Sequence, residues 1–245
     1  MTTPFTATLV AEAAKLGLAL TAPQTEALLA YMALIEKWNK VYNLTAVRDP
    51  ADMLTHHLLD SLAVVAPLLK HAQGRGTQGQ SLQGQTPHGQ EPQESKLRVL
   101  DVGSGAGLPG TVLAIMCPQL DVTCVDTVGK KAAFIQNTAL TLKLPNLRGV
   151  HARVEEMQAA PFDVVTSRAF SSLVDFVTLT KFHVKQPEAG MPGGVWMAMK
   201  GKHPADELTA LPGNVEVFHV EQLQVPGLGA ERCLVWMRAN SHAVA

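Results

Sequence analysis

The sequence predicts an α/β fold built on one seven-stranded, mostly parallel sheet that ends in an antiparallel hairpin. Residues 97–102 form a short apolar run rich in β-forming residues, and a glycine-rich turn and a helix follow directly. Further short apolar runs alternate with helical segments along the rest of the chain. The last two runs, 215–224 and 232–238, are joined by a short Pro-Gly-Leu-Gly segment that leaves no room for a crossover helix, so they are predicted to pair antiparallel.

The glycine-rich turn is typical of a nucleotide-binding site. Its glycines at positions 103, 105, 107 and 110 permit φ > 0 and let a ligand approach the backbone without a Cβ in the way. Two overlapping patterns fit it: the dinucleotide fingerprint G-x-G-x-x-G, and the acid followed by G-x-G-x-G of S-adenosylmethionine (AdoMet) methyltransferases, in which the acid is Asp101. Asp126 ends the next strand about twenty residues later, where both classes place a carboxylate for the ribose hydroxyls.

Length and strand order favour the methyltransferase. A dehydrogenase needs a second mononucleotide-binding half and a place for its substrate, and 245 residues with this pattern do not supply both. Seven strands with an antiparallel end are the layout of class I AdoMet-dependent methyltransferases, a Rossmann-like fold. We therefore expect AdoMet, and not NAD, as the cofactor.

The composition is that of a globular protein without a strong overall charge. Apolar residues make up 47% of the chain and the net charge is −1, so a nucleic-acid-binding surface has to be a local patch. The three cysteines form no C-x-x-C pair, which fits a reducing compartment. No stretch reaches the ~18 apolar residues of a membrane span. A cytoplasmic protein that does not bind membranes is predicted.

The chain is predicted to have three parts. Residues 1–70 show helical periodicity and are expected to form a small N-terminal helical cap. Residues 71–96 are crowded with Gln and Gly and almost lack apolar side chains, so a disordered insertion or linker is expected there. Residues 97–240 are expected to form the methyltransferase domain.

A histidine pair stands out in the helical part. His56 and Asp60 are four residues apart on one predicted helix and could pair across one turn. The adjacent His56 and His57 cannot both face one metal ion from a helix, so no metal site is expected.

Six short motifs occur in order along nearly the whole chain, apart from the Gln/Gly-rich stretch. They are Trp38-Asn-Lys-Val-Tyr-Asn-Leu-Thr45, His57-Leu-Leu-Asp60-Ser61, Asp101-Val-Gly-Ser-Gly-Ala-Gly-Leu-Pro-Gly110, Arg153-Val-Glu-Glu156, Ser167-Arg-Ala-Phe170 and Lys200-Gly201. The glycine motif alone is common to many enzymes, but the ordered set resembles the RsmG (GidB) family. Members of that family are bacterial 16S ribosomal RNA guanine-N7 methyltransferases.

The resemblance implies AdoMet as methyl donor and, as acceptor, a guanine in the decoding region of the small subunit, in 16S rRNA or in the 30S particle. The family's cofactor contacts carry over to Gly103, Leu108, Val154, Glu155 and Arg168. Our reading of the residues adds Asp101, Gly105 and Asp126. Arg168 follows the fourth strand at its carboxyl end, where it could bind either the cofactor's carboxylate or an RNA phosphate.

The turn after the fourth strand argues against two methylation chemistries. Methylation of an exocyclic amine usually goes with an Asn/Asp-Pro-Pro-aromatic turn, but this turn is Ser167-Arg-Ala-Phe170. Carbon-5 methylation needs a cysteine nucleophile beside the cofactor, and no cysteine directly follows the fourth or fifth strand. Guanine N7 has an in-plane lone pair and no proton to lose. Positioning alone, which can supply ~7–11 kcal/mol, is then enough, and no catalytic side chain is predicted.

RNA contacts are expected near the carboxyl ends of the strands. The candidates are Lys130, Lys131, Phe170, Lys200 and Lys202. Phe170 could stack on the target base or belong to the core, and the helical part around Arg48 and His56 is the alternative position for the basic patch. Two other functions stay open: a small-molecule methyltransferase, and an RNA-binding or assembly module that retains AdoMet.

Overall fold

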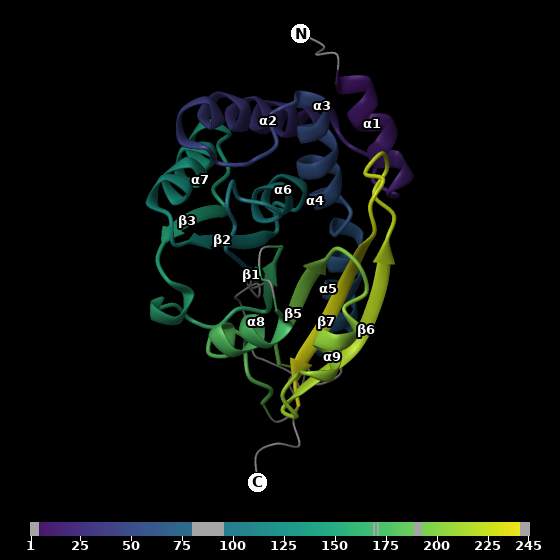
Figure 1. Ribbon diagram of the computed structural model, residues 1–245, viewed down its shortest axis with the longest axis vertical. Coiled ribbons are helices and arrows are strands. Elements are labelled where there is room, and N and C mark those ends of the chain that lie inside the picture. Colours follow the sequence, from purple (N-terminus) through teal and green to yellow (C-terminus); the bar gives the residue numbers. More distant parts are fainter. Residues whose placement is uncertain (1–4, 80–95, 169, 171, 189–192, 241–245) are drawn as a thin grey trace, which may run out of the picture.

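A mixed seven-stranded sheet forms the centre of the molecule (Figure 1). The computed structural model describes residues 5–79, 96–168, 170, 172–188 and 193–240. The strand order is β3-β2-β1-β4-β5-β7-β6, and β7 runs antiparallel to both of its neighbours. The strands are β1 (Leu97–Val102), β2 (Leu120–Asp126), β3 (Leu147–His151), β4 (Val164–Ser167), β5 (Val195–Lys200), β6 (Val215–Leu223) and β7 (Arg232–Ala239). This arrangement confirms the predicted sheet and its antiparallel hairpin.

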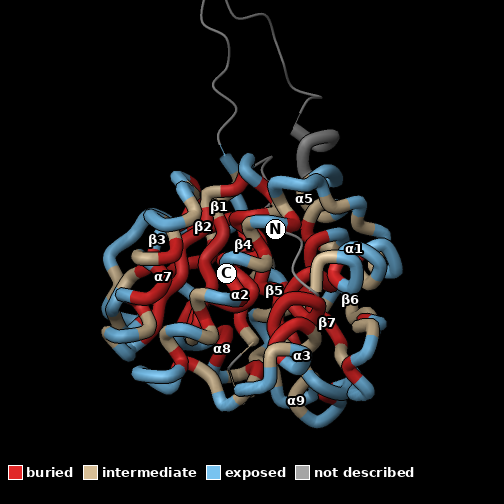
Figure 2. Tube along the Cα trace, turned by 90° about the horizontal axis from the view of Figure 1, so that it is seen from above, coloured by how far each residue is buried: buried red, intermediate tan, exposed pale blue. Residues whose placement is uncertain are grey.

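The sheet is buried on both faces because alternate residues of each central strand point into different helical layers. Val99 and Val122 belong to one hydrophobic cluster, and Leu100 and Val125 belong to the other. Such strands therefore appear in the sequence as continuous apolar runs. Figure 2 shows the buried segments, in red, gathered in the centre with exposed segments around them. The exposed edge strand β6 carries an irregularity between Val217 and His219.

Helices cover the two faces. They are α1 (Thr6–Lys15), α2 (Ala22–Tyr42), α3 (Pro50–Met53), α4 (Asp60–Leu62), α5 (Val65–Gly79), α6 (Gly110–Met116), α7 (Gly129–Thr141), α8 (Leu173–Thr180) and α9 (Ala205–Thr209), with a π-helical turn Leu54–Leu59 between α3 and α4 and a 3₁₀ turn Val154–Glu156 after β3. A capping box between Thr21 and Gln24 starts α2, because each residue's side chain accepts from the other's backbone amide. Within the described residues, no helix combines the length and hydropathy needed to cross a membrane.

The N-terminal helices are part of the main core. Leu28 and Ile35 of α2 lie in the same buried cluster as Val99 of β1 and Phe134 of α7. On the opposite face, α8 supplies Phe176 to the second cluster. The helical part predicted as a cap therefore covers one face of the sheet directly.

The boundary predicted at residue 71 is wrong, because α5 continues to Gly79. The helix is anchored by Val65 and Leu68, which are buried in the core, and the ring of His71 lies 4.9 Å from that of Trp236. Once a helix is nucleated by packing, each further residue adds a hydrogen bond, even in a sequence rich in Gln and Gly. Residues 80–95, most of the predicted insertion, lie outside the described residues.

Candidate cofactor and substrate site

The loop after β1 uses left-handed backbone at three glycines. Gly103, Gly105 and Gly107 have φ of 66°, 60° and 88°, values that side chains with a Cβ rarely adopt. A Cβ at Gly107 would overlap Thr111 Oγ1, whereas a Cβ at Gly105 would meet no atom within 4 Å. The backbone at Gly105 therefore faces open space that a ligand can occupy. This space fits the expected approach of a cofactor to the loop.

Asp101 lies beneath this loop and does not reach a surface open to ligands. It is fully buried, and its Oδ2 accepts a hydrogen bond of 2.9 Å from the amide of Gly110 at the start of α6. Its Oδ1 has no hydrogen-bond partner among the described residues. Burial raises the pKa of Asp101 to about 7. Asp101 therefore supports the loop from below in this structure, and a direct contact between Asp101 and the cofactor stays a prediction.

Asp126 ends β2, as predicted, and fixes the glycine loop from the side. Its Oδ2 accepts from the amide of Gly105 at 2.9 Å, and its Oδ1 accepts from the amide of Val128 at 2.8 Å. A carboxylate oxygen can accept more than one hydrogen bond, so the expected contacts with ribose hydroxyls remain compatible with this geometry. Asp126 joins the loop to the start of α7.

Two of the cofactor residues expected from the family resemblance have buried side chains. Leu108 and Val154 are 3% and 5% exposed and lie in the two hydrophobic clusters. A cofactor contact from either residue would therefore come from its backbone. Glu155, by contrast, has a side chain that is 40% exposed, with Oε1 3.5 Å from Arg153 Nε. Its carboxylate stands in the 3₁₀ turn after β3 and is open to a ligand.

Arg168 takes part in an ion-pair cluster that sequence reasoning missed. Its Nη1 donates to Asp60 Oδ2 at 2.9 Å and to the carbonyl of His56 at 2.8 Å. The other oxygen of Asp60 accepts from Arg232 Nε at 2.8 Å. The Asp60 side chain is only 2% exposed. One buried carboxylate therefore holds two guanidinium groups, one after β4 and one at the start of β7.

The pairing of His56 with Asp60 that their spacing suggested is not formed, and the π-helical turn Leu54–Leu59 explains why. The amide of Asp60 donates hydrogen bonds to the carbonyls of Thr55 and His57 and none to the carbonyl of His56. That carbonyl instead accepts a hydrogen bond from Arg168 Nη1. His56 Nδ1 lies 3.1 Å from the carbonyl of Asp52. Such turns are rare and often occur at functional sites. No local sequence pattern marks one, and the only available signal was an aspartate inside an apolar helical stretch.

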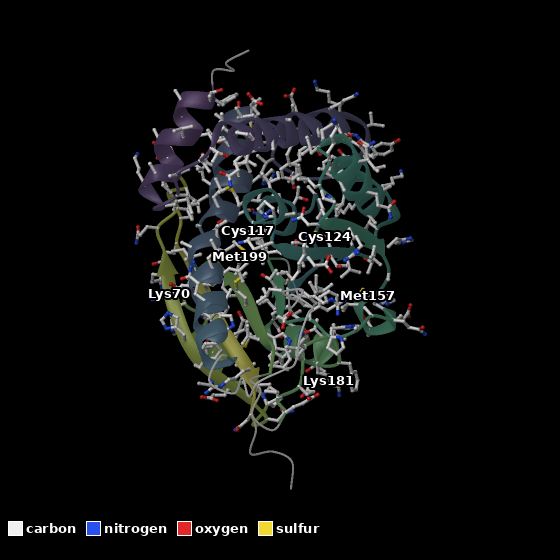
Figure 3. The ribbon with its side chains drawn as sticks, turned by 180° about the vertical axis from the view of Figure 1, so that it is seen from behind. Lys70, Cys117, Cys124, Met157, Lys181 and Met199 are labelled. Atoms are coloured by element: carbon white, nitrogen blue, oxygen red, sulfur yellow. The ribbon has the colours of Figure 1, made fainter. Side chains whose placement is uncertain are left out.

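A cavity of about 380 Å³, named here the arginine cavity, opens beside this cluster. It is lined by Val47, His56, His57, Asp60, Arg168, Met199, Lys200, Gly201 and Arg232. Met199, labelled in Figure 3, comes from the carboxyl end of β5, the edge where open α/β sheets bind ligands. Burial, helped by the charge of Arg168, lowers the pKa of His57 to about 4. The His57 ring is therefore neutral at pH 7.

A larger hollow of about 710 Å³ lies at the other end of β5, between α5 and the β6–β7 hairpin. Its lining includes Lys70, His71 and Trp236 and none of the predicted site residues. It lies away from the carboxyl edge of the parallel strands. The arginine cavity and the glycine loop are therefore the candidate site.

The predicted RNA contacts differ in how accessible they are. Lys200, one of the candidate RNA contacts, is only 13% exposed and its Nζ lies 2.8 Å from Glu207 Oε1, which disfavours a direct contact with RNA. Lys202 and Lys130 are exposed, Lys131 is partly exposed, and the Nζ of Lys130 lies 5.3 Å from the centre of the Tyr42 ring.

The ring of Phe170 lies 5.2 Å from that of Phe176 and packs against the core, which favours the structural alternative for this residue.

The chain matches a known family over most of its length. The GidB family model, described as rRNA small subunit methyltransferase G, matches residues 24–75 and 87–235. The ribosomal RNA small subunit methyltransferase G of Paracidovorax citrulli (strain AAC00-1) is 58% identical over 239 residues, covering 98% of this chain and 92% of that protein. The protein of the same name from Polaromonas sp. (strain JS666 / ATCC BAA-500) is 59% identical over 228 residues, covering 93% and 91%.

Solved structures show the same class of fold. The crystal structure of Burkholderia thailandensis 1,6-didemethyltoxoflavin-N1-methyltransferase, with S-adenosylhomocysteine bound, covers 91% of this chain and 92% of its own, with a TM-score of 0.50 and 15% identity. The likeness confirms the predicted methyltransferase layout. The family match confirms the resemblance seen in the six motifs. The chain therefore belongs to the GidB family and is a methyltransferase of small-subunit ribosomal RNA.

Proposed function

We propose that the protein methylates N7 of a guanine in the decoding region of 16S rRNA, in the cytoplasm, by positioning alone. The observation that carries this proposal is that neither buried acceptor in the arginine cavity, Asp60 or His57, is available as a base, and that the described lining holds no cysteine, serine or threonine. Both oxygens of Asp60 accept from guanidinium groups, and the low pKa of His57 makes it a weak base. A reaction that removes a proton from its acceptor atom would find only the partly exposed His56 as a base in this lining, whereas attack by guanine N7 removes no proton.

The cysteines support the same chemistry. Cys117, Cys124 and Cys233 are all buried (the first two are labelled in Figure 3). Cys233 pairs with Lys200 across β5 and β7 and so lies near the site, but its Sγ donates to the carbonyl of Lys202 at 3.5 Å and burial raises its pKa. A protonated, buried thiol is a poor nucleophile. Carbon-5 methylation through a cysteine adduct is therefore disfavoured.

AdoMet is the methyl donor, and when bound it supplies an electrophilic methyl group on a sulfonium. The residues of this chain bind AdoMet and orient it. The open side of Gly105 leaves room for the methionine part, Asp126 can accept from ribose hydroxyls, and the exposed carboxylate of Glu155 can accept from the adenine amino group. Such alignment of two reactants can supply ~7–11 kcal/mol of the barrier.

The test is methyl transfer from labelled AdoMet to three acceptors: protein-free 16S RNA, assembled 30S particles and small amines. Labelled RNA is then treated with borohydride and aniline, which cleave at N7-methylguanosine because that base is cationic and labile. Cleavage at one guanine of the decoding region is expected. Label that resists cleavage would overturn the N7 assignment. Label on small amines alone would identify a small-molecule methyltransferase, and binding of RNA and AdoMet without transfer would identify an assembly module.

A further inference from the structure

We propose that Arg232 and Arg168, held by Asp60, form a binding site for a phosphodiester of the RNA beside the methylated base. This inference rests on the proposed RNA acceptor. It adds Arg232, from the last strand of the sheet, to the residues that contact the substrate. The ligand class is the phosphate anion of a nucleic acid.

The charge of the cluster is the first argument. Arg168 and Arg232 carry two positive charges against the single negative charge of Asp60. Two other basic residues of the lining leave this excess of one positive charge unchanged. Lys200 is paired with Glu207, and His57 is neutral at pH 7. A partly buried charge without a partner is costly. An anion entering the arginine cavity would remove this imbalance.

The second argument is the geometry of the guanidinium groups. Arg168 uses Nη1 for Asp60 and the His56 carbonyl, and Arg232 uses Nε for Asp60 and Nη1 for the carbonyl of Glu231. No hydrogen bond from the Nη2 atom of either arginine reaches an acceptor in the described part of the chain. The two side chains are 26% and 23% exposed. A guanidinium already fixed by a carboxylate binds phosphate with little further loss of freedom.

Most of the residues expected to bind the cofactor lie outside the arginine cavity. Its lining contains no residue of the glycine loop and neither Asp126 nor Glu155, and Arg168 is the one expected cofactor contact in it. The lining comes instead from the N-terminal helical part and from the ends of β4, β5 and β7 at the carboxyl edge of the sheet. An anion beside Arg232 therefore lies on the acceptor side, where the chemistry of RNA supplies a phosphodiester and the cofactor's only anion is its carboxylate.

The test compares Arg232→Gln with the matched control Arg238→Gln. Arg238 is near the other end of β7, is 53% exposed, and pairs with Glu216 at 2.8 Å. Affinities for 30S particles and for AdoMet are measured at several salt concentrations. We expect Arg232→Gln to weaken RNA binding roughly tenfold, the scale of one charge-assisted hydrogen bond. The log–log salt slope should fall by ~0.7–0.9, one phosphate contact. AdoMet affinity should stay within about twofold of wild type, and Arg238→Gln should change neither.

Two results would overturn the proposal. One is an unchanged RNA affinity and salt slope in Arg232→Gln. The other is a loss of AdoMet affinity with normal RNA binding, which would assign the anion to the cofactor's carboxylate.

Because Asp60 is buried, Arg232→Gln could fold poorly, so the wild-type protein provides a second measurement. Phenylglyoxal modification of Arg232, followed by peptide mapping, should be blocked by RNA and not by AdoMet. A lack of protection by RNA contradicts the proposal.

Methyl transfer by the wild-type enzyme distinguishes a failure of the phosphate site from a failure of the proposed function. If it methylates 30S particles while Arg232→Gln keeps a normal salt slope, only the phosphate site is wrong. If it methylates no RNA, the proposed function itself fails.

Discussion

The hydroxyl of Tyr31 donates a hydrogen bond of 2.6 Å to the carbonyl of Ala106, and so joins helix α2 to the glycine loop. The same hydroxyl lies 3.3 Å from the carbonyl of Gly107. Tyr31 is fully buried, and this burial holds its pKa well above the usual value, so the hydroxyl keeps its proton. The N-terminal helices therefore fix the shape of the loop that faces the cofactor.

Replacing Tyr31 with Phe should weaken both the fold and the cofactor site. The change leaves the buried carbonyl of Ala106 without its donor, which costs about 1–3 kcal/mol of unfolding free energy. AdoMet binding should also weaken, because the loop loses its anchor. Urea denaturation and titration calorimetry measure the two effects. The control is Tyr42→Phe at the exposed end of the same helix, and equal results for the two variants would contradict this role of Tyr31.

Gly105→Ala should abolish AdoMet binding while only moderately destabilising the fold. Its backbone is left-handed, which costs a residue with a Cβ about 1–2 kcal/mol, and the added methyl group would occupy the open space beside the loop. Gly229→Ala is a close control, because its φ of 62° matches the 60° of Gly105 and its Cβ also meets no atom within 4 Å. Both variants should lose similar stability. If AdoMet binds Gly105→Ala as tightly as Gly229→Ala, the cofactor does not approach at Gly105.

The buried Asp101 should give the protein a stability that falls as the pH rises from about 4 to about 7. Its pKa is raised from 3.8 when unfolded to about 7 when folded. The folded state therefore binds the extra proton in this window, and its advantage is lost as the pH rises through the folded pKa. The expected change is on the order of a few kcal/mol.

The measurement is the free energy of unfolding of wild type minus that of Asp101→Asn across this pH range. Taking the difference is necessary because His57 acts in the opposite direction. Its pKa falls from 6.5 to about 4 on folding, so its contribution is lost as the pH falls through that range. A difference that does not vary with pH would show that Asp101 ionises normally in the folded protein.

Lys202→Gln and Lys200→Gln should have different effects, although the sequence suggested that both lysines contact RNA. Lys202 is exposed, so its loss should reduce the salt slope of RNA binding by ~0.7–0.9. Lys200 is largely buried against Glu207, so its loss should lower the melting temperature and leave the salt slope nearly unchanged. Thermal unfolding and salt-dependent RNA binding distinguish the two. A reduced slope in Lys200→Gln alone would reverse this assignment.

What could be predicted from the sequence was local. The strand, the glycine loop and Asp126 were recognisable because a buried parallel strand, left-handed turns and a strand-end carboxylate each leave a short pattern. The ion-pair cluster around Asp60 could not be recognised in this way. Its partners Arg168 and Arg232 lie 108 and 172 residues away along the chain, and a π-helical turn directly precedes Asp60. Lys200 was named as a candidate RNA contact because nothing in the sequence indicated that Glu207 of the short helix α9 would pair with it.

The antiparallel direction of β7 places its first residue, Arg232, at the arginine cavity. Because β7 is antiparallel to β5, it begins at the edge where the parallel strands end, and its first residue, Arg232, meets Asp60 there. Proteins are synthesised from the N-terminus, so Asp60 and Arg168 emerge from the ribosome well before Arg232 does. A chain whose translation stops before β7 has the complete glycine loop but lacks one of the two cations of the cavity. The site proposed for the RNA phosphate is thus finished only after the glycine loop, Asp60 and Arg168 have all been translated.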